Sequence, residues 1–317
     1  MKTAMNRPFM HRSMIAAMVI LSAATAFGLG GREAGDFSYD SVRSVSIEAE
    51  TFDVQVVAVA GQSATLSIER NPSGHTVYHE RTSHGVRVWV ERRFSLLSLG
   101  RSGLLVMTVP SDSAVQIDTS TGGVSVSGAR HRVSIRTSTG TVDVSGTVGE
   151  LSVSTSTGNV SIREADGTLN VRTSTGRIRI EDSHGTITSR SSTGQQSLVG
   201  IDGSIDATSS TGRLAFDHVR GVMRVKTSTG SQTGTAVVLT GDSSFEASTG
   251  RIAIELAQPL SAFAFDLRST TGTLEVAGER SQQRLFLAGT GIRVSGTTST
   301  GSQRFTSVAT ATSSDRG

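Results

Sequence analysis

The sequence predicts an all-β protein, a right-handed parallel β-solenoid with 18-residue coils and an N-terminal β cap. Two observations carry this prediction: a Ser-Thr-Gly triplet whose glycine returns every 18 residues, and a second glycine halfway along each step. The triplet glycines are Gly122, Gly140, Gly158, Gly176, Gly194, Gly212 and Gly230, and the intermediate ones are Gly149, Gly167, Gly185, Gly203 and Gly221. So strict a period is typical of solenoids, in which each repeat stacks only on its neighbours.

Each coil is expected to contain two short strands, each closed by a glycine. Counted from the triplet glycine, apolar residues occupy offsets two, four, eleven and thirteen, as Val160, Ile162, Leu169 and Val171 do in one coil. Alternation of β-branched residues predicts strands with one buried face. Because nine is odd, a glycine at positive φ must reset the alternation at the corner. We therefore expect two parallel sheets that face each other across a thin aliphatic core, with right-handed crossovers.

Residues 1–26 are expected to be a signal peptide. A basic stretch precedes an apolar run over residues 14–30, and Ala24-Thr-Ala26 offers a small-residue cleavage site. The run is short for a membrane span, and an uncleaved N-terminal anchor is the alternative. Because the chain has no cysteine, the lipoprotein route, disulfides and thiolate metal sites are excluded. The expected location is the periplasm or the cell surface, with the N-terminal segment engaging the membrane during export.

The charge balance argues against a nucleic-acid partner. Lys2, Arg7 and Arg12 precede the first acidic residue, Glu33, and account for the formal net charge of +3. Cleavage after Ala26 would leave 27 basic and 27 acidic side chains. The high isoelectric point therefore gives no support for binding to nucleic acid.

Residues 27–101 are predicted to form the N-terminal β cap. Five segments alternate as strands (45–48, 53–59, 64–69, 76–80 and 86–91), and Asn71-Pro-Ser-Gly74 is typical of a hairpin turn. This part lacks the triplet period, and a solenoid needs a cap over its open edge. We expect Trp89, the only tryptophan, to pack within this cap rather than to bind a ligand.

Residues 102–301 are predicted to form the solenoid and residues 302–317 a disordered tail rich in Ser and Thr. After Gly230 the step loosens, with triplet-type glycines at Gly250, Gly272 and Gly301. Larger apolar residues such as Phe263 keep the strand pattern there. Longer corners and larger side chains are what we expect of the terminal coils.

The junction Val109-Pro-Ser-Asp-Ser-Ala-Val-Gln-Ile-Asp-Thr-Ser-Thr-Gly-Gly-Val-Ser-Val and the repeated T-S-T-G-x-V-x-V … G-x-L-x-V resemble the bacterial putative-adhesin family. The resemblance covers roughly residues 40–300 and follows the order of the parts as well as the motifs. It implies an exported β-solenoid-like domain of unknown function at the envelope or surface. The family supplies no catalytic residues that could be carried over.

One column of titratable residues is the candidate for enzyme chemistry. Asp166, His184 and Asp202 share offset eight, and stacked coils would bring them about 5 Å apart. Beside them lie Glu164, Glu181, Asp182, Asp217 and His218. We favour a solvated turn edge with Arg163 over Glu181 as a surface pair, because exposed turns collect such residues. We expect no catalytic residues, no cofactor site and no metal site.

Basic residues form a broken row at offset fourteen, namely Arg136, Arg172, Arg190 and Lys226, with Arg177, Arg179 and Arg213 on the other face. They could contact anionic glycans or lipid headgroups, but a solubilising face is favoured. The calcium-binding β-roll is disfavoured because the regular aspartates of its nine-residue repeat are missing. Ice binding is disfavoured because the threonines abut the corner glycine and serine replaces two of them, at Ser191 and Ser209.

The expected function is that of an exported, non-enzymatic scaffold of the cell envelope or surface, with an adhesive role. Two alternatives stay open: a polysaccharide-active β-helix enzyme that uses the Asp166–His184–Asp202 edge, and a regulatory partner in envelope stress. A surface glycan or an envelope protein is the expected class of partner. The sequence does not fix the oligomeric state.

Overall fold

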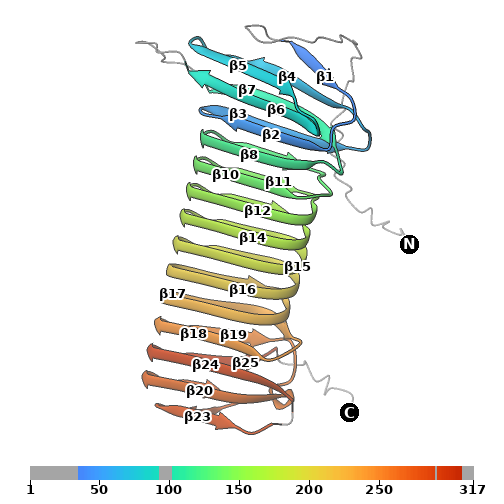
Figure 1. Ribbon diagram of the computed structural model, residues 1–317. Helices are drawn as coiled ribbons and strands as arrows, with labels where there is room; N and C mark the ends of the chain where they lie inside the picture. The colour runs from blue at the N-terminus through green and yellow to red at the C-terminus, as the bar shows by residue number, and fades with distance from the viewer. Residues whose placement is uncertain (1–34, 93–101, 290, 309–317) are drawn as a thin grey trace, which may run out of the picture.

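The computed structural model describes residues 35–92, 102–289 and 291–308, which form a rod of stacked β-coils (Figure 1). Its strands are hydrogen-bonded into one sheet of 25 strands that wraps around the rod. In the described residues the sole helical element is a 3₁₀ turn, η1 (Leu260–Ala262), and none of their helices could span a membrane. The prediction of an all-β solenoid is confirmed. The expected signal peptide lies outside the described residues.

The middle of the rod consists of parallel strands whose pairing repeats along the chain. They are β8 (Ala114–Thr121), β9 (Val124–Ser127), β10 (Val133–Thr139), β11 (Val142–Ser145), β12 (Val148–Thr157), β13 (Val160–Arg163), β14 (Asp166–Thr175), β15 (Ile178–Thr193), β16 (Gln196–Asp217) and β17 (Arg220–Leu239). Val133 lies opposite Val115 on one side and opposite Leu151 on the other, 18 residues away in each direction. Each strand therefore takes its partners from the preceding and the following coil.

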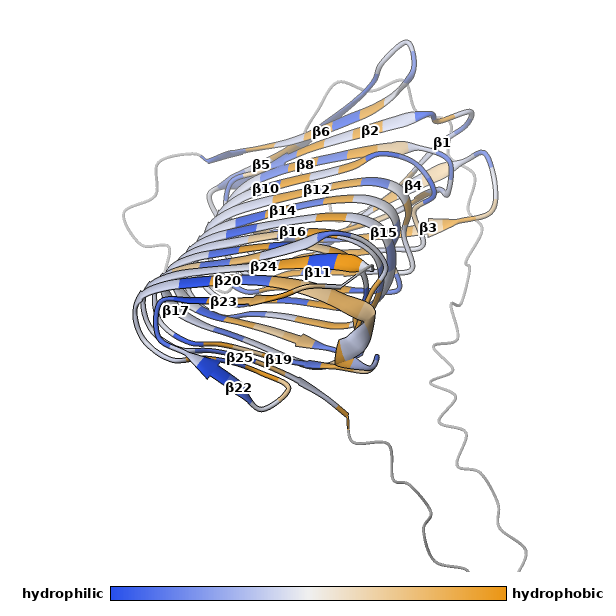
Figure 2. Cartoon of the chain, turned by 90° about the horizontal axis from the view of Figure 1, so that it is seen from below, coloured by the Kyte–Doolittle hydropathy of each residue, from blue (hydrophilic) through white to orange (hydrophobic). Residues whose placement is uncertain are grey.

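The wrapped sheet has two sides that enclose the core, and we call them the wide sheet and the narrow sheet. The wide sheet contains β8, β10, β12 and β14, the narrow sheet contains β9, β11 and β13, and β15 to β17 pass from one sheet to the other. Seen along the rod, each coil makes a flattened loop (Figure 2). Val160, Ile162, Leu169 and Val171 are all buried, so the predicted offsets of the core are confirmed. We call the outward side of the wide sheet the wide face.

Glycine is required at both corners for two physical reasons. Gly176 has a φ of +144°, and a Cβ atom on it would lie 1.9 Å from the carbonyl oxygen of Gly158 in the preceding coil. Gly185, in the second column, has a φ of +114° and would meet the carbonyl oxygen of Gly167 at 2.1 Å. The residue at offset six also takes a left-handed conformation, as Glu164 does with a φ of 52°. The alternation of the strands is therefore reset both at glycines and at the residue at offset six. The sequence pattern indicated only the glycines.

At the N-terminal end the spatial order departs from the chain order. The strands are β1 (Asp36–Tyr39), β2 (Ser44–Ala49), β3 (Phe52–Val59), β4 (Ala64–Arg70), β5 (His75–Arg81), β6 (Gly85–Arg92) and β7 (Gly103–Pro110). The coil β2–β3 lies between β8–β9 on one side and β6–β7 on the other. Antiparallel strands close the outer edge: β5 on β6, and β4 on β7 with β1 beyond it. The segment expected to be a cap thus contains parallel coils as well as the strands that close them.

A hydrogen bond joins the two outermost strands of this end. The hydroxyl of Tyr39 on β1 lies 2.6 Å from Nδ1 of His79 on β5, and Phe37 lies against the same imidazole, with ring centroids 4.0 Å apart. Burial raises the pKa of Tyr39 to about 12 and lowers the pKa of His79. Both groups are therefore held neutral where they close the end of the core.

The C-terminal end is built in the same way, with an inserted coil and antiparallel closing strands. Its strands are β18 (Ser243–Thr249), β19 (Ile252–Leu256), β20 (Phe263–Thr271), β21 (Leu274–Val276), β22 (Glu279–Ser281), β23 (Arg284–Leu287), β24 (Ile292–Thr300) and β25 (Gln303–Ser307). The last coil, β24–β25, lies between β18–β19 and β20–β21. Antiparallel β23 and β22 pair with β20 and β21.

The prediction of a disordered tail from residue 302 is wrong for residues 303–307. These residues form β25, and Phe305 is fully buried between Phe245 and Phe265, with ring centroids 5.6 and 5.5 Å away. The segment has little apolar character of its own, but a coil on each side of it completes its hydrogen bonds and covers its phenylalanine. Residues 309–317 lie outside the described residues.

Candidate functional site

The wide face carries a central row of side chains that crosses successive strands. The row runs through Tyr78, Trp89, Glu48, Asp118, Arg136, Ser154, Arg172, Arg190, Thr208, Lys226 and Glu246. Because adjacent strands lie about 4.8 Å apart, such a row follows the long axis of the rod. The central row includes the four basic residues singled out in the sequence.

Most of these basic residues are paired with carboxylates. The nitrogen–oxygen distances are 3.7 Å for Arg136 and Asp118, 3.6 Å for Arg190 and Asp206, and 3.0 Å for Lys226 and Glu246. Within the described residues Arg172 has no ion pair, whereas Arg179 on the narrow sheet is bonded to Glu181. The central row is therefore largely neutralised and does not form a continuous track for a polyanion, in agreement with a solubilising face.

The candidate enzyme column is aligned but does not converge. Asp166 lies opposite His184, and His184 opposite Asp202, in consecutive coils, and all three side chains are exposed. No hydrogen bond or ion pair joins the three within the described residues, and Asp202 instead lies 3.6 Å from Arg220. In that same part of the chain no group of three or more histidine, aspartate and glutamate residues is arranged to hold a metal ion.

The acidic residues beside this column serve the corner. Glu164 and Asp182, like His218, occupy the left-handed position at offset six, with φ of 52°, 47° and 51°. The predicted pair of Arg163 and Glu181 is present at 3.6 Å. A hydrogen bond from Arg179 lowers the pKa of the Glu181 carboxyl. These contacts are those of a solvated turn.

The threonines of the triplet motif do not form a flat outer ladder. The first threonine, at offset fifteen, points inward, and Thr137, Thr155 and Thr173 are buried. Serine follows it on the wide face, as at Ser156. An ice-binding surface of aligned Thr-x-Thr pairs is therefore not formed.

Three buried glutamines, which the sequence reasoning missed, stand at offset two. Gln196, Gln232 and Gln303 are fully buried, and each donates its amide to the hydroxyl five residues earlier, on the other side of the corner, and to a backbone carbonyl of an adjacent strand. The signal that could have found them is Gly-x-Gln, where the other coils have Gly-x-Val, Gly-x-Ile or Gly-x-Leu. Because both partners lie inside the protein, these amides stabilise the corner rather than bind a ligand.

Trp89 packs against a strand of the cap, as expected, but it does so half-buried on the wide face and not in the interior. Val88 and Val90 on either side of it are buried, and alternation then turns the indole outward. The indole stacks on Tyr78 of β5, with ring centroids 5.4 Å apart and ring planes 15° apart. The guanidinium of Arg87 lies 5.4 Å from the ring centroid of Trp89.

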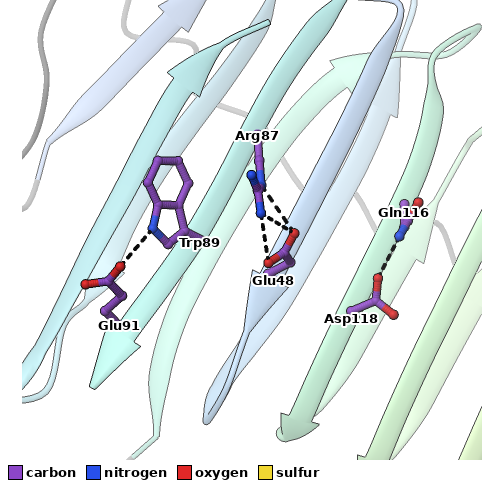
Figure 3. A network of polar contacts seen from close by, with 6 residues as sticks. All are labelled: Glu48, Arg87, Trp89, Glu91, Gln116 and Asp118. Carbon is purple, nitrogen blue, oxygen red and sulfur yellow. Dashed lines mark hydrogen bonds and ion pairs between the residues drawn. The ribbon is translucent and has the colours of Figure 1, made fainter. Parts of the chain in front are cut away.

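Polar contacts surround Trp89 on the wide face (Figure 3). The indole nitrogen of Trp89 donates to the carboxylate of Glu91 at 3.4 Å, and Arg87 forms an ion pair with Glu48 at 2.9 Å. On the next strand Gln116 donates to Asp118 at 2.8 Å. These contacts fix the directions of the side chains in this patch.

A shallow groove of about 540 Å³ begins at Trp89 and runs along the rod, open to solvent. Its lining includes Glu48, Glu50, Trp89, Asp118, Arg136 and Ser154, which come from β6, β2, β8, β10 and β12 and the turn after β2. The inward-pointing Thr119 and Thr137 lie between the central row and the outward-pointing Ser120 and Ser138, and they line its floor. This groove combines a concave shape, an aromatic side chain and charged side chains.

Comparison with known proteins adds a family. The family model described as Toastrack DUF4097 matches residues 40–306. No curated protein matches the chain significantly. A solved structure from Clostridium sporogenes ATCC 15579, described as a "putative cell adhesion protein", covers 87% of this chain and 100% of its own, at 6% identity and a TM-score of 0.21. A likeness that weak carries no argument.

Proposed function

The chain belongs to the Toastrack DUF4097 family, and on that premise we propose that it is an exported, non-enzymatic scaffold of the cell envelope or surface that acts as an adhesin. Its partner is a surface glycan or an envelope protein, and nucleic acid plays no part. The observation that carries this proposal is the wide face itself. More than ten strands present ordered rows of polar side chains along one side of a rod.

A surface of this kind suits binding more than catalysis. Catalysis needs reacting groups that converge on one point, whereas the rows of the wide face are spread along the rod at the strand spacing. Extended contact with a long partner uses that spread, because many weak contacts can form at once.

The finer features of the fold belong to the same proposal. The 18-residue step between paired residues supports a coil of that length. Parallel crossovers of this kind are right-handed in nearly all proteins, and we assign that hand to the coils.

Export is proposed from the N-terminal sequence. The signal peptide would be cleaved after Ala26, so N-terminal sequencing of the natural protein should begin at or near Phe27. Recovery of intact Met1 from a soluble cytoplasmic fraction would contradict export, and intact Met1 in a membrane fraction would indicate an anchor.

The adhesive role is tested with purified mature protein and whole cells. Labelled protein should bind to cells of its own species or to their isolated envelopes, and labelling of intact or osmotically opened cells should find it outside the cytoplasm. Failure to bind any envelope fraction would overturn the adhesive role.

The competing enzyme hypothesis has its own test. Asp166→Asn and His184→Gln should leave stability and envelope binding unchanged, because both side chains are exposed and unpaired in the described structure. A polysaccharide-cleaving activity that either substitution abolishes would instead favour the β-helix enzyme.

A further inference from the structure

We propose that the groove beside Trp89 binds a linear polysaccharide whose sugars carry amino groups. This inference rests on the proposed adhesive function and names its binding site and its class of ligand. Three features of the groove support it: an ordered aromatic surface at one end, a straight open course along the rod, and an excess of carboxylates.

The aromatic surface has the chemistry of a sugar platform. An indole offers a large, rigid apolar surface with a polar edge, and such side chains dominate the energetics of binding sites. Trp89 is stacked on Tyr78 at 5.4 Å, and its indole nitrogen is engaged by Glu91 at 3.4 Å. Because these contacts already hold the ring, the Trp89 side chain loses little additional conformational freedom when a ligand binds there.

The course of the groove fits a linear chain. It crosses β6, β2, β8, β10 and β12, five strands in spatial sequence. At about 4.8 Å between neighbouring strands, the crossing is roughly 19 Å long. The groove is open to solvent along this course.

The charge of the groove selects among polysaccharides. Glu48, Glu50 and Asp118 supply three carboxylates, and Arg136 supplies one positive charge. Glu48 is engaged by Arg87, and Asp118 lies 3.7 Å from Arg136, whereas Glu50 has no ion pair within the described residues. Protonated amino groups would complement this balance, while a polyanion would meet like charge.

The experiment uses the chain's own reporter. Trp89 is the sole tryptophan of the protein, so intrinsic fluorescence of the full mature chain reports on this site and no other. A glucosamine hexamer, at a pH at which its amino groups are protonated, should produce a saturable change in emission. An N-acetylglucosamine hexamer should bind more weakly, and polygalacturonate should not bind.

Matched variants separate the site from the fold. By calorimetry, Trp89→Ala should weaken binding of the glucosamine hexamer at least tenfold, and Trp89→Phe should weaken it less because a ring remains. Glu50→Gln should weaken it several-fold and reduce its dependence on salt. Phe286→Ala is the control, because Phe286 is 60% exposed under Arg284 at the opposite end of the rod, and binding should not change.

Three results would overturn the proposal: no binding of the glucosamine hexamer, equal or tighter binding of polygalacturonate, or unchanged binding in both Trp89→Ala and Glu50→Gln. If the hexamer does not bind but the wild type still binds envelopes, the site is wrong and the adhesive function stands. If the hexamer binds at Trp89 but envelopes do not, the site stands and the adhesive function is wrong.

Discussion

The middle of the rod and its two ends are built from the same kind of strand but follow different rules of assembly. Between β8 and β17, neighbours along the chain are neighbours in space, and the paired residues are separated by one period. At each end a coil is inserted between two others, β2–β3 at one end and β24–β25 at the other. Antiparallel strands then close the stack.

The difference shows how a repeat protein protects its edges. A coil in the middle is covered on both sides by its neighbours, whereas the last coil of a simple solenoid would present one open edge. Insertion places the coils nearest the chain termini inside the stack, so that neither can fray from an edge. The core also differs, from layers that are aliphatic except at Phe216 in the middle to the cluster of Phe245, Phe265 and Phe305 at the C-terminal end.

Removal of the inserted coil should have the largest effect. A chain that ends at residue 290 loses β24–β25 and leaves β18–β19 and β20–β21 without their shared partner. We expect a loss of more than about 5 kcal/mol in unfolding free energy, because burial of Phe305 alone contributes roughly 3–5 kcal/mol. Urea melts followed by circular dichroism measure the loss.

Removal of a middle coil is the matched control. Deletion of Asn159–Gly176 joins Gly158 to Arg177, preserves the inward side of every later strand, and should reduce stability only slightly. Deletion of nine residues, Thr168–Gly176, places narrow-sheet sequence in the wide sheet and should cost clearly more. Equal damage from the two deletions would contradict the 18-residue coil.

The glycine columns allow a sharper comparison. Gly158 and Gly61 have nearly the same φ, +159° and +155°, but a Cβ on Gly158 would lie 1.8 Å from the carbonyl oxygen of Gly140, and one on Gly61 would meet nothing within 4 Å. Gly158→Ala should therefore cost about 3 kcal/mol or more and Gly61→Ala about 1 kcal/mol. Similar melting temperatures for the two variants would show that coil stacking does not require glycine.

Substitution of the buried glutamines should cost different amounts of unfolding free energy, according to how many hydrogen bonds each side chain makes. The Oε1 atom of Gln196 accepts a 2.7 Å hydrogen bond from Ser189, whereas Oε1 of Gln232 is buried without a partner. Gln196→Leu should cost roughly 2–3 kcal/mol and Gln232→Leu roughly 1 kcal/mol, because the second change also removes an unsatisfied oxygen. Gln55→Leu, on the solvent side of β3, is the control in the same denaturation series.

The smallest expected effect is a pH response of the N-terminal end. Burial lowers the pKa of His79 in the folded state, so its contribution to stability is present above the unfolded pKa of 6.5 and declines as the pH falls through the lower folded value. Amide hydrogen exchange should show β1 and β5 opening more readily in mild acid, while β12 and β14 change less. In His79→Gln the acid-dependent opening of β5 should disappear, and its persistence would assign the effect to another group.

Much of the middle of the rod could be predicted from the sequence. The period predicts the length of the coil, the alternation predicts the buried face that contains Val160 and Leu169, and the glycines predict the positions of the corners. The same alternation places Trp89 on the outer side of the cap, because Val88 and Val90 occupy the inward positions.

What the tertiary structure decided is which strands become neighbours at the ends, and the candidate site follows from that choice. Glu48 lies between Trp89 and Asp118 because β2 is inserted between β6 and β8, although residues 48 and 118 are far apart in the chain. A repeating sequence determines its own pairing locally, since each coil provides the template for the next. The end strands have several edges of similar character available to them. The strand order that forms the groove is therefore selected by the total apolar surface that each possible pairing buries over the whole stack.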